Sequence, residues 1–268
     1  MELNDNIVKL CEELKLPIMI EEYHKVATTA AKENWTYTEF LNELLQLESS
    51  AKLLRVKSTL TKFAGFPAIK TLEQFDYNFT VGVNSKQIDE LALLGFVKRN
   101  ENIILLGESG VGKTHLAIAL AYKAVESRFK VKFTSLADLL ATASRAKREK
   151  RYDGFLKTII MPSVLVIDEI GYFNMSKEEA NHFFQIISKR YERGSTILTS
   201  NLVFSKWTAI FANDKVVTTA ILDRVLHHSH IINIQGDSYR LKEKQNSGLI
   251  DSDIFKTKEG STKNSNVN

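Results

Sequence analysis

Residues 103–116, IILLGESGVGKTHL, constrain this chain more than any other stretch. A glycine, four residues and Gly-Lys-Thr follow an apolar run and precede an alanine- and leucine-rich helical pattern, which is the strand–loop–helix context of a P-loop. Glycines allow such a loop to bring its backbone N–H groups close to an anion, and the following helix adds the positive end of its dipole. The segment therefore predicts a binding site for nucleotide phosphates.

Two side chains of this loop have specific expected roles. Lys113 is expected to reach the β- and γ-phosphates of ATP, and the hydroxyl of Thr114 to ligate Mg²⁺. His115 follows on the predicted helix, where packing is a better expectation for it than catalysis. The residues expected to line the nucleotide are Gly107, Glu108, Ser109, Gly110, Val111, Gly112, Lys113, Thr114 and His115.

The composition is that of a globular protein. With 268 residues, 44% of them hydrophobic and 25% charged, the chain is long enough for one α/β domain and a smaller appendage. A net charge of +4 says little about nucleic acid, so local clusters must decide that question. Cys11 is the single cysteine, the N-terminus lacks a signal-peptide pattern, and no apolar run reaches the ~20 residues of a membrane span. We expect a soluble cytoplasmic protein with no membrane segment.

The chain divides into three parts by pattern. Residues 1–70 read as an all-helical domain that contacts DNA or a partner, with a capping box at residues 36–39 and a helix break at Gly65-Phe66-Pro67. Its last helix ends in the basic residues Lys52, Arg55, Lys57 and Lys62, which suit either a solvated helix face or a binding surface. Residues 71–245 read as an ATPase domain, and the polar residues 246–268 as a disordered tail.

Strands and helices alternate through the second part. Strands are predicted at 103–106, 131–134, 164–167, 196–199 and 231–234, with a capped helix at 84–96 and another from Ser176 to Gly194. This alternation predicts an α/β fold with a parallel sheet between layers of helices, and leaves little room for a C-terminal lid.

The connection between the second and third predicted strands is longer than a crossover requires. It spans 29 residues, 135–163, whereas one crossover helix needs about 10–15. Two helical pieces are therefore expected, with the second carrying five bases in seven residues: Arg145, Lys147, Arg148, Lys150 and Arg151. These bases suit either a solvated helix face or contacts to DNA phosphates.

Carboxylates follow the third predicted strand. The run VLVI at 164–167 is apolar, and Asp168-Glu169 comes directly after it. Because a charge inside a buried strand would be desolvated, the acids are expected at its exposed end. Asp168 is expected to hold Mg²⁺, and Glu169 to polarise the water that attacks ATP.

Further polar residues have two interpretations each. Asn201 follows the next strand, where its amide could orient the attacking water or simply form a turn. Arg224 lies late in a helix, either as a surface residue or as an arginine finger presented to a neighbouring subunit, and Arg240 poses the same question. His227, His228 and His230 have no cysteine or carboxylate at ligand spacing, so the sequence favours no metal site there.

In combination these motifs resemble the IstB-like ATPases, which help DDE-type transposases and are close relatives of DnaC-type helicase loaders. The resemblance is carried by GESGVGKTHLAIAL at 107–120, VLVIDEIGY at 164–172, TSN at 199–201, AILDRVLHH at 220–228, SYRLKEK at 238–244, and, nearer the N-terminus, YTEFLNELLQLE at 37–48 and FP…KTLEQFDY at 66–77.

The resemblance implies an AAA+ fold with an extra helix after the second strand, facing nucleic acid, and a reduced or absent lid. It also implies a homo-oligomer with ATP at its subunit interfaces, assembly on duplex DNA, and delivery of that DNA to a transposase. Arg224 takes the position of the arginine finger, and Arg240 that of a possible second sensor. The alternative is a helicase loader that binds single strands; a scaffold without hydrolysis is disfavoured by the Asp168-Glu169 pair.

Overall fold

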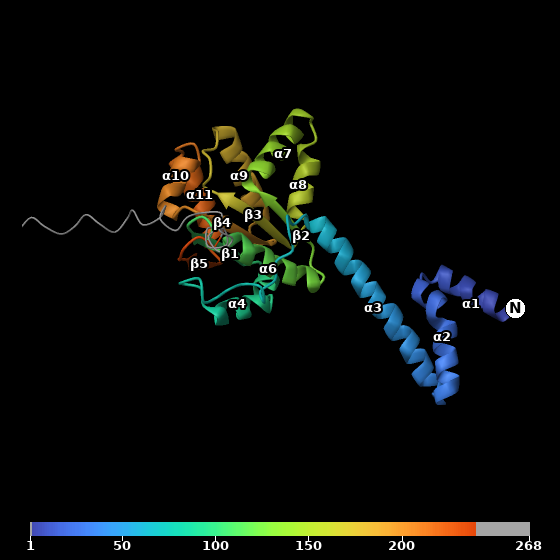
Figure 1. Cartoon of the computed structure of the whole chain (residues 1–268). Helices are drawn as coiled ribbons and strands as arrows, with labels where there is room; N and C mark the ends of the chain where they lie inside the picture. Colours follow the sequence, from blue (N-terminus) through green and yellow to red (C-terminus); the bar gives the residue numbers. More distant parts are fainter. Residues whose placement is uncertain (1, 240–268) are drawn as a thin grey trace, which may run out of the picture. The chain divides into compact units, whose positions relative to one another are not determined.

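The computed structural model describes residues 2–239 and forms two compact units (Figure 1). The first unit covers residues 1–62 and the second begins at Phe63, whereas the composition placed a boundary near residue 70. The helices of the first part are α1 (Glu2–Glu13), α2 (Pro17–Glu33) and α3 (Tyr37–Ala64). The glycine and proline that follow Ala64 end α3 where the sequence predicted.

A buried carboxylate joins two helices of the first unit. The N-cap of α2, Leu16, has no side chain that could accept a hydrogen bond. Glu48 of α3 accepts instead, from Ile18 N at 2.8 Å and Met19 N at 3.1 Å, and it also pairs with Arg55 at 2.8 Å. Glu48 is 4% exposed. One of the bases that could have served as a DNA contact is therefore committed to holding this carboxylate.

The second unit is a parallel α/β sandwich, as predicted. The strands are β1 (Asn102–Gly107), β2 (Val131–Ser135), β3 (Val164–Ile170), β4 (Ser195–Ser200) and β5 (Ser229–Ile234), in the order β2-β3-β4-β1-β5 with every pair parallel. The helices are α4 (Ser85–Ala92), α5 (Gly95–Lys98), α6 (Lys113–Glu126), α7 (Leu136–Arg148), α8 (Tyr152–Ile160), α9 (Lys177–Arg190), η1 (Phe204–Lys206), α10 (Trp207–Ile210) and α11 (Lys215–Leu226).

Helices cover both faces of the sheet (Figure 1). Leu165, Ile167 and Leu198 belong to one core cluster with the apolar side chains of α7, α8, α9 and α11. Alternate strand residues, such as Val166 and Ile197, point to the opposite face, where α6 packs, and they are fully buried too. Burial on both faces explains why these strands read as continuous apolar runs.

Two expectations for this unit are wrong in detail. The helix predicted at 84–96 is broken, because Leu94 adopts a left-handed conformation with φ 61°. This turn allows Phe96 and Val97, at 1% and 5% exposure, to be buried together in α5. The helix that begins at Ser176 ends at Arg190 rather than at Gly194, which lies in the following turn.

The connection after β2 does hold two helices, as predicted, but the basic cluster lies elsewhere within it. Leu136, Leu139 and Leu140 form an apolar stripe that extends α7 to Arg148, so three of the bases occupy the last turn of the first helix. Lys150 and Arg151 lie in the turn that precedes α8. The bases thus gather at a helix C-terminus, where the helix dipole favours positive charge.

Candidate nucleotide site

The P-loop connects β1 to α6 at the carboxyl edge of the sheet. Gly112 is the N-cap of α6 and has φ 99°, a conformation that residues with a side chain rarely adopt. A Cβ at this position would come within 2.7 Å of the ring of Phe75. The glycine is therefore required both by its conformation and by the aromatic ring that covers the loop.

Lys113 lies inside the loop that precedes it. Its side chain is 6% exposed, and Nζ donates hydrogen bonds to the carbonyl oxygens of Gly107 at 2.8 Å and Glu108 at 2.6 Å. A buried ammonium group requires oxygen partners. Phosphate oxygens offer the same kind of partner with negative charge, so the loop holds the cation where an incoming phosphate can bind it.

Asp168 is the centre of a hydroxyl–carboxylate cluster. Thr114 donates to both of its carboxylate oxygens, at 3.0 and 3.1 Å, and Thr199 donates a further short hydrogen bond to Oδ1. Asp168 is 6% exposed. The carboxyl ends of the adjacent strands β3, β4 and β1 bring these groups together, as expected for a parallel sheet. The structure thus brings together the oxygens of Thr114 and Asp168, whose role as Mg²⁺ ligands stays a prediction.

A β-bulge separates the neighbouring carboxylate from Asp168. The register of β3 against β4 shifts between Ile167 and Ile170. Within this shift Glu169 has φ 68°, and its backbone N–H donates to Thr199 Oγ1 at 3.0 Å. Bulges of this kind redirect side chains. Here the bulge leaves Glu169 exposed beside the buried Asp168.

Thr199 is a site residue that the sequence analysis missed. Its hydroxyl donates to Asp168 and accepts from the backbone of Glu169, so one side chain positions both acidic residues. In the sequence it is one more polar residue at the end of an apolar strand. The register that places it opposite the bulge cannot be read from the chain itself.

A cavity of about 400 Å³ lies over the P-loop. The segment from Pro67 to Thr80 forms its other wall, and this wall was not predicted either. Thr80 has a buried hydroxyl with no hydrogen-bond partner among the described residues. Antiparallel hydrogen bonds of 2.8 Å between Val81 and Gln235 tie the end of this segment to the chain after β5. This pairing anchors the end of the covering segment, residues 67–80, beside the chain that follows β5.

Most of the predicted loop residues line the cavity, but Gly107 and Glu108 do not. Lining residues from the predicted set are Ser109, Gly110, Val111, Gly112, Lys113, Thr114, His115, Asp168 and Glu169. His115 packs against the ring of Phe75 at 5.4 Å, and its Nε2 lies 2.9 Å from Thr71 O. Burial lowers the pKa of His115, which favours the neutral ring. Its role is to hold the covering segment against α6.

Asn201 is not among the residues that line the cavity. Its Oδ1 is buried, has no hydrogen-bond partner among the described residues, and faces Gly171, where a Cβ would approach to 2.5 Å. The sensor role of Asn201 stays a prediction.

Arg224 lies at the opposite edge of the sheet from the P-loop. Its guanidinium donates to Ala220 O at 2.8 Å and stacks on Phe184 at 5.1 Å. It lines a separate cavity of about 200 Å³ together with Asn102 at the amino end of β1. Arg224 therefore does not reach the P-loop of its own chain. Arg240 and the predicted tail lie outside the described residues.

The basic cluster is exposed and partly neutralised. All five bases, Arg145, Lys147, Arg148, Lys150 and Arg151, are exposed. Lys147 pairs with Glu178 at 3.0 Å and Arg151 with Glu149. Hydrogen bonding from Arg151, and then the charges of Arg145 and Arg148, lower the pKa of Glu149. Five bases against two acids leave a local excess of three positive charges.

The residues at the carboxyl edge fit ATP and Mg²⁺. The buried Lys113 ammonium can exchange loop carbonyls for phosphate oxygens, and Thr114 with Asp168 offers oxygen ligands of the kind that Mg²⁺ prefers. The fold and this site define a nucleotide-binding P-loop protein.

Sequence comparison identifies the family. Residues 9–247 match the family of IstB-like ATP-binding proteins, and the chain belongs to that family. It is 47% identical over 241 residues to a protein of Pseudomonas aeruginosa named as an ATP-binding protein of insertion sequence IS21, covering 90% of this chain and 91% of that one. It is 41% identical over 243 residues to a similarly named protein of insertion sequence IS5376 from Geobacillus stearothermophilus, covering 91% and 96%.

Solved structures share the fold at low sequence identity. DnaI aligns with a TM-score of 0.54 and 22% identity, covering 62% of this chain and 91% of that one. AMPPCP-bound DnaA from Aquifex aeolicus aligns with a TM-score of 0.52 and 20% identity, covering 68% and 56%. Among residues 2–239, no helix combines the length and apolar character that a membrane crossing demands.

Proposed function

We propose that this protein hydrolyses ATP and acts as a DNA-bound helper of a transposase. The single observation that supports hydrolysis is the arrangement around Thr199, which holds the buried Asp168 and the exposed Glu169 side by side next to Thr114. Family membership and the insertion-sequence relatives support the link to transposition.

In this proposal each residue has one task. The P-loop backbone and Lys113 bind the β- and γ-phosphates, while Thr114 and Asp168 hold Mg²⁺, which neutralises charge on the phosphates when bound. Glu169 accepts a proton from the attacking water, and Asn201 orients that water. Thr199 keeps the two acids in place. The products are ADP and inorganic phosphate.

The first test is Lys113→Ala. Removing the buried ammonium should lower ATP affinity at least tenfold, about 1.4 kcal/mol, because its charge is aimed at the phosphates. Equilibrium titration with a fluorescent ATP analogue measures this, and circular dichroism checks the fold. Exposed Lys86→Ala is the matched control. Unchanged affinity in a folded Lys113→Ala protein would refute the site assignment.

We infer that Arg224 completes the site of a neighbouring subunit in a homo-oligomer. The position of Arg224 at the far edge of its own sheet supports action between chains. Arg224→Ala should bind ATP normally and hydrolyse it slowly. Mixing it with Glu169→Gln protein should restore part of the activity, because one interface then pairs an intact Arg224 with an intact Glu169. No recovery in mixtures shown to co-assemble would contradict this role.

We infer that the basic cluster contacts duplex DNA through phosphates. Among residues 2–239, Arg145, Arg148 and Lys150 are the members of the cluster that pair with no acid. Each phosphate contact adds about 0.9 to the slope of log affinity against log salt. Changing all three to alanine should flatten that slope by about 2–3 and leave ATP binding intact. Triple replacement of the exposed Lys86, Lys98 and Lys130 is the matched control. An unchanged slope would move the DNA contact to Lys52, Lys57 and Lys62.

A helicase loader is the alternative function. The fold is shared with DnaI and DnaA, but at identities that establish fold alone. Comparing affinity for duplex and single-stranded DNA of one length and one salt concentration separates the two functions. Preference for the duplex supports the transposase helper, and preference for the single strand supports the loader.

A further inference from the structure

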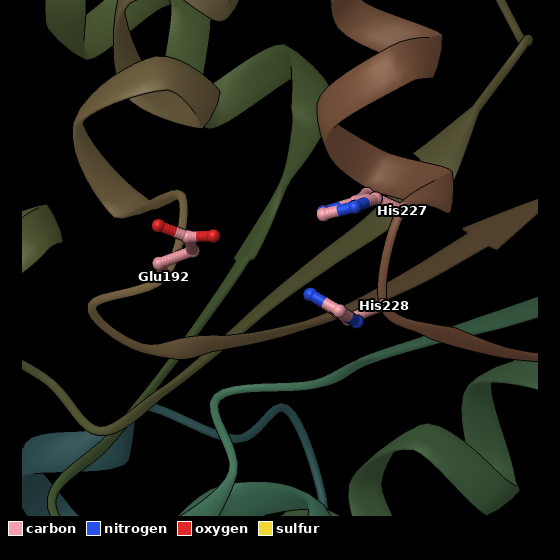
Figure 2. A group of neighbouring side chains, drawn as sticks. All are labelled: Glu192, His227 and His228. Carbon is pink, nitrogen blue, oxygen red and sulfur yellow. The ribbon is translucent and has the colours of Figure 1, made fainter.

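A carboxylate from the turn after α9 and two consecutive imidazoles after α11 meet at the amino edge of the sheet. Glu192 lies in the turn between α9 and β4, while His227 and His228 follow α11. One ligand atom from each of these residues lies within 4.8 Å of the other two. Figure 2 shows the two rings and the carboxylate directed toward a shared space. All are exposed, so an ion can enter from solvent.

We propose that Glu192, His227 and His228 form a binding site for Zn²⁺. Two imidazole nitrogens and one carboxylate oxygen are a ligand set that zinc accepts, with a water molecule in the fourth position. Imidazole also discriminates against Mg²⁺, which prefers an all-oxygen shell. The site is therefore chemically distinct from the Thr114–Asp168 pair of the nucleotide site.

The two histidines lie where the chain leaves α11, which ends at Leu226, and enters β5, which begins at Ser229. Their side chains therefore do not follow the helical spacing. His227 is the C-cap of α11, and the carbonyl of His228 already accepts from Asn102 N at 2.7 Å. The centroids of the two rings consequently lie 4.0 Å apart, with the ring planes inclined by 46°. No carboxylate lies at ligand spacing from these histidines in the sequence, because Glu192 is remote from them in the chain.

Other contacts hold the ligands in position. The hydroxyl of Tyr191 lies 2.7 Å from Nδ1 of His227, which occupies one ring nitrogen and leaves the other for a metal. Metal-bound histidines commonly have such a second partner. The carbonyl of Glu192 accepts from the amide of Asn100 at 3.1 Å, which fixes the backbone of the carboxylate ligand.

Zinc at this position would join the turn after α9 to the end of α11. Arg224 occupies the last turn of α11 and lines the same cavity as Glu192 and His228. The site would therefore stabilise the region that carries Arg224 without touching the P-loop. It requires neither ATP nor DNA, so its existence does not depend on the function proposed above.

Zinc titration of the untagged full-length protein tests the site. The protein carries Cys11→Ser, because that thiol is half-buried and could bind zinc itself, and the buffer contains excess Mg²⁺ to occupy oxygen sites. Competition with a chromophoric chelator should give one bound Zn²⁺ per chain. Glu192→Gln and His228→Ala should each weaken binding at least tenfold, whereas exposed His24→Ala on α2 should not.

A thermal shift provides the second measurement. When zinc exceeds its dissociation constant a hundredfold, Tm should rise by roughly 5 °C, because the ion binds the folded state. Glu192→Gln is a conservative change at an exposed position, so it should fold normally and lose the shift. Equal zinc affinity in the parent and both ligand variants, or no binding by a folded parent, would overturn the proposal.

Discussion

The two edges of the central sheet both contain a buried cation, but they use it differently. At the carboxyl edge Lys113 is 6% exposed and bonds to two carbonyls of its own loop. At the amino edge Arg190 is 2% exposed and donates to the carbonyls of Ile159, Ile160, Pro162 and Ser195, and to Thr196 Oγ1. The first cation can exchange its partners for a ligand, while the second is surrounded on all sides by fixed protein oxygens.

We therefore expect the carboxyl edge to determine ligand binding and the amino edge to determine the stability of the fold. The partners of Arg190 come from the end of α8, the loop before β3 and the start of β4, so one guanidinium joins three segments. Asn102 adds a similar connection, accepting from Thr196 N at 3.0 Å and donating to Val225 O at 3.1 Å. At the carboxyl edge, by contrast, Lys113 can exchange its two carbonyl partners for the oxygens of a ligand. Mutations at the two edges should therefore affect different measurements.

The largest effect should come from Glu169→Gln at the carboxyl edge. The substitution keeps the shape and loses the carboxylate that accepts a proton, so the rate of ATP hydrolysis should fall about 10³-fold. ATP affinity and Tm should stay at wild-type values. Steady-state phosphate release measures the rate. Glu126→Gln, at the far end of the P-loop helix, is the control, and a wild-type rate for Glu169→Gln would place the base elsewhere.

Arg190→Met should show the opposite behaviour. The apolar side chain fills similar volume but leaves five oxygens without their donor, so we expect the free energy of unfolding to fall by about 3 kcal/mol. Burial lowers the pKa of Arg190 to about 10, so the cation persists throughout the neutral range.

Denaturant unfolding tests this change, and the exposed Arg193→Met is its control. The Kd for ATP, measured on the folded fraction, should not move. A large loss of ATP affinity with little loss of stability would show that the two edges are not separable in this way.

Thr199→Val should lower the rate of ATP hydrolysis by a smaller factor than Glu169→Gln does. The methyl group keeps the volume of the hydroxyl but neither donates to Asp168 nor accepts from the N–H of Glu169. We expect turnover to fall about tenfold, which corresponds to about 1.4 kcal/mol. Thr199→Ser should restore the rate in the same phosphate-release assay. If Thr199→Val and wild type turn over equally, the bulge is held by other contacts.

The sequence pointed to more of the functional side chains at the carboxyl edge than at the amino edge, because those at the carboxyl edge lie in local patterns. The P-loop and the acids after β3 are local patterns, because each side chain is positioned by its own strand end, and the fold class follows from the same alternation. Glu192, His227 and Arg190 act through neighbours that are remote in the chain. Thr199 was missed for the same reason, since its partners depend on the register of β4 against a bulge.

The smallest predicted effect is a pH-dependent change in stability at the amino edge. Glu101, just before β1, accepts from Arg99 Nε at 2.6 Å and contacts His230 Nε2 at 2.8 Å. Hydrogen bonding from Arg99, opposed by burial and assisted by His230, lowers the pKa of Glu101 from 4.5 to about 2. A carboxyl with a lowered pKa in the folded state stabilises the protein above pH 4.5, and this contribution is lost as the pH falls toward 2.

The side chain of Arg99 is 60% exposed, so solvent screening reduces the contribution to about 1 kcal/mol. Glu101→Gln should therefore unfold more easily than wild type at pH 6, with the gap narrowing at pH 3, as measured by urea denaturation at both values. Exposed Glu21→Gln on α2 should follow wild type at both values. A gap that stays constant between the two pH values would mean that Glu101 contributes through packing rather than charge. ATP affinity at pH 6 should be the same in all three proteins, because Glu101 lies at the edge that holds the fold and not at the edge that holds the nucleotide.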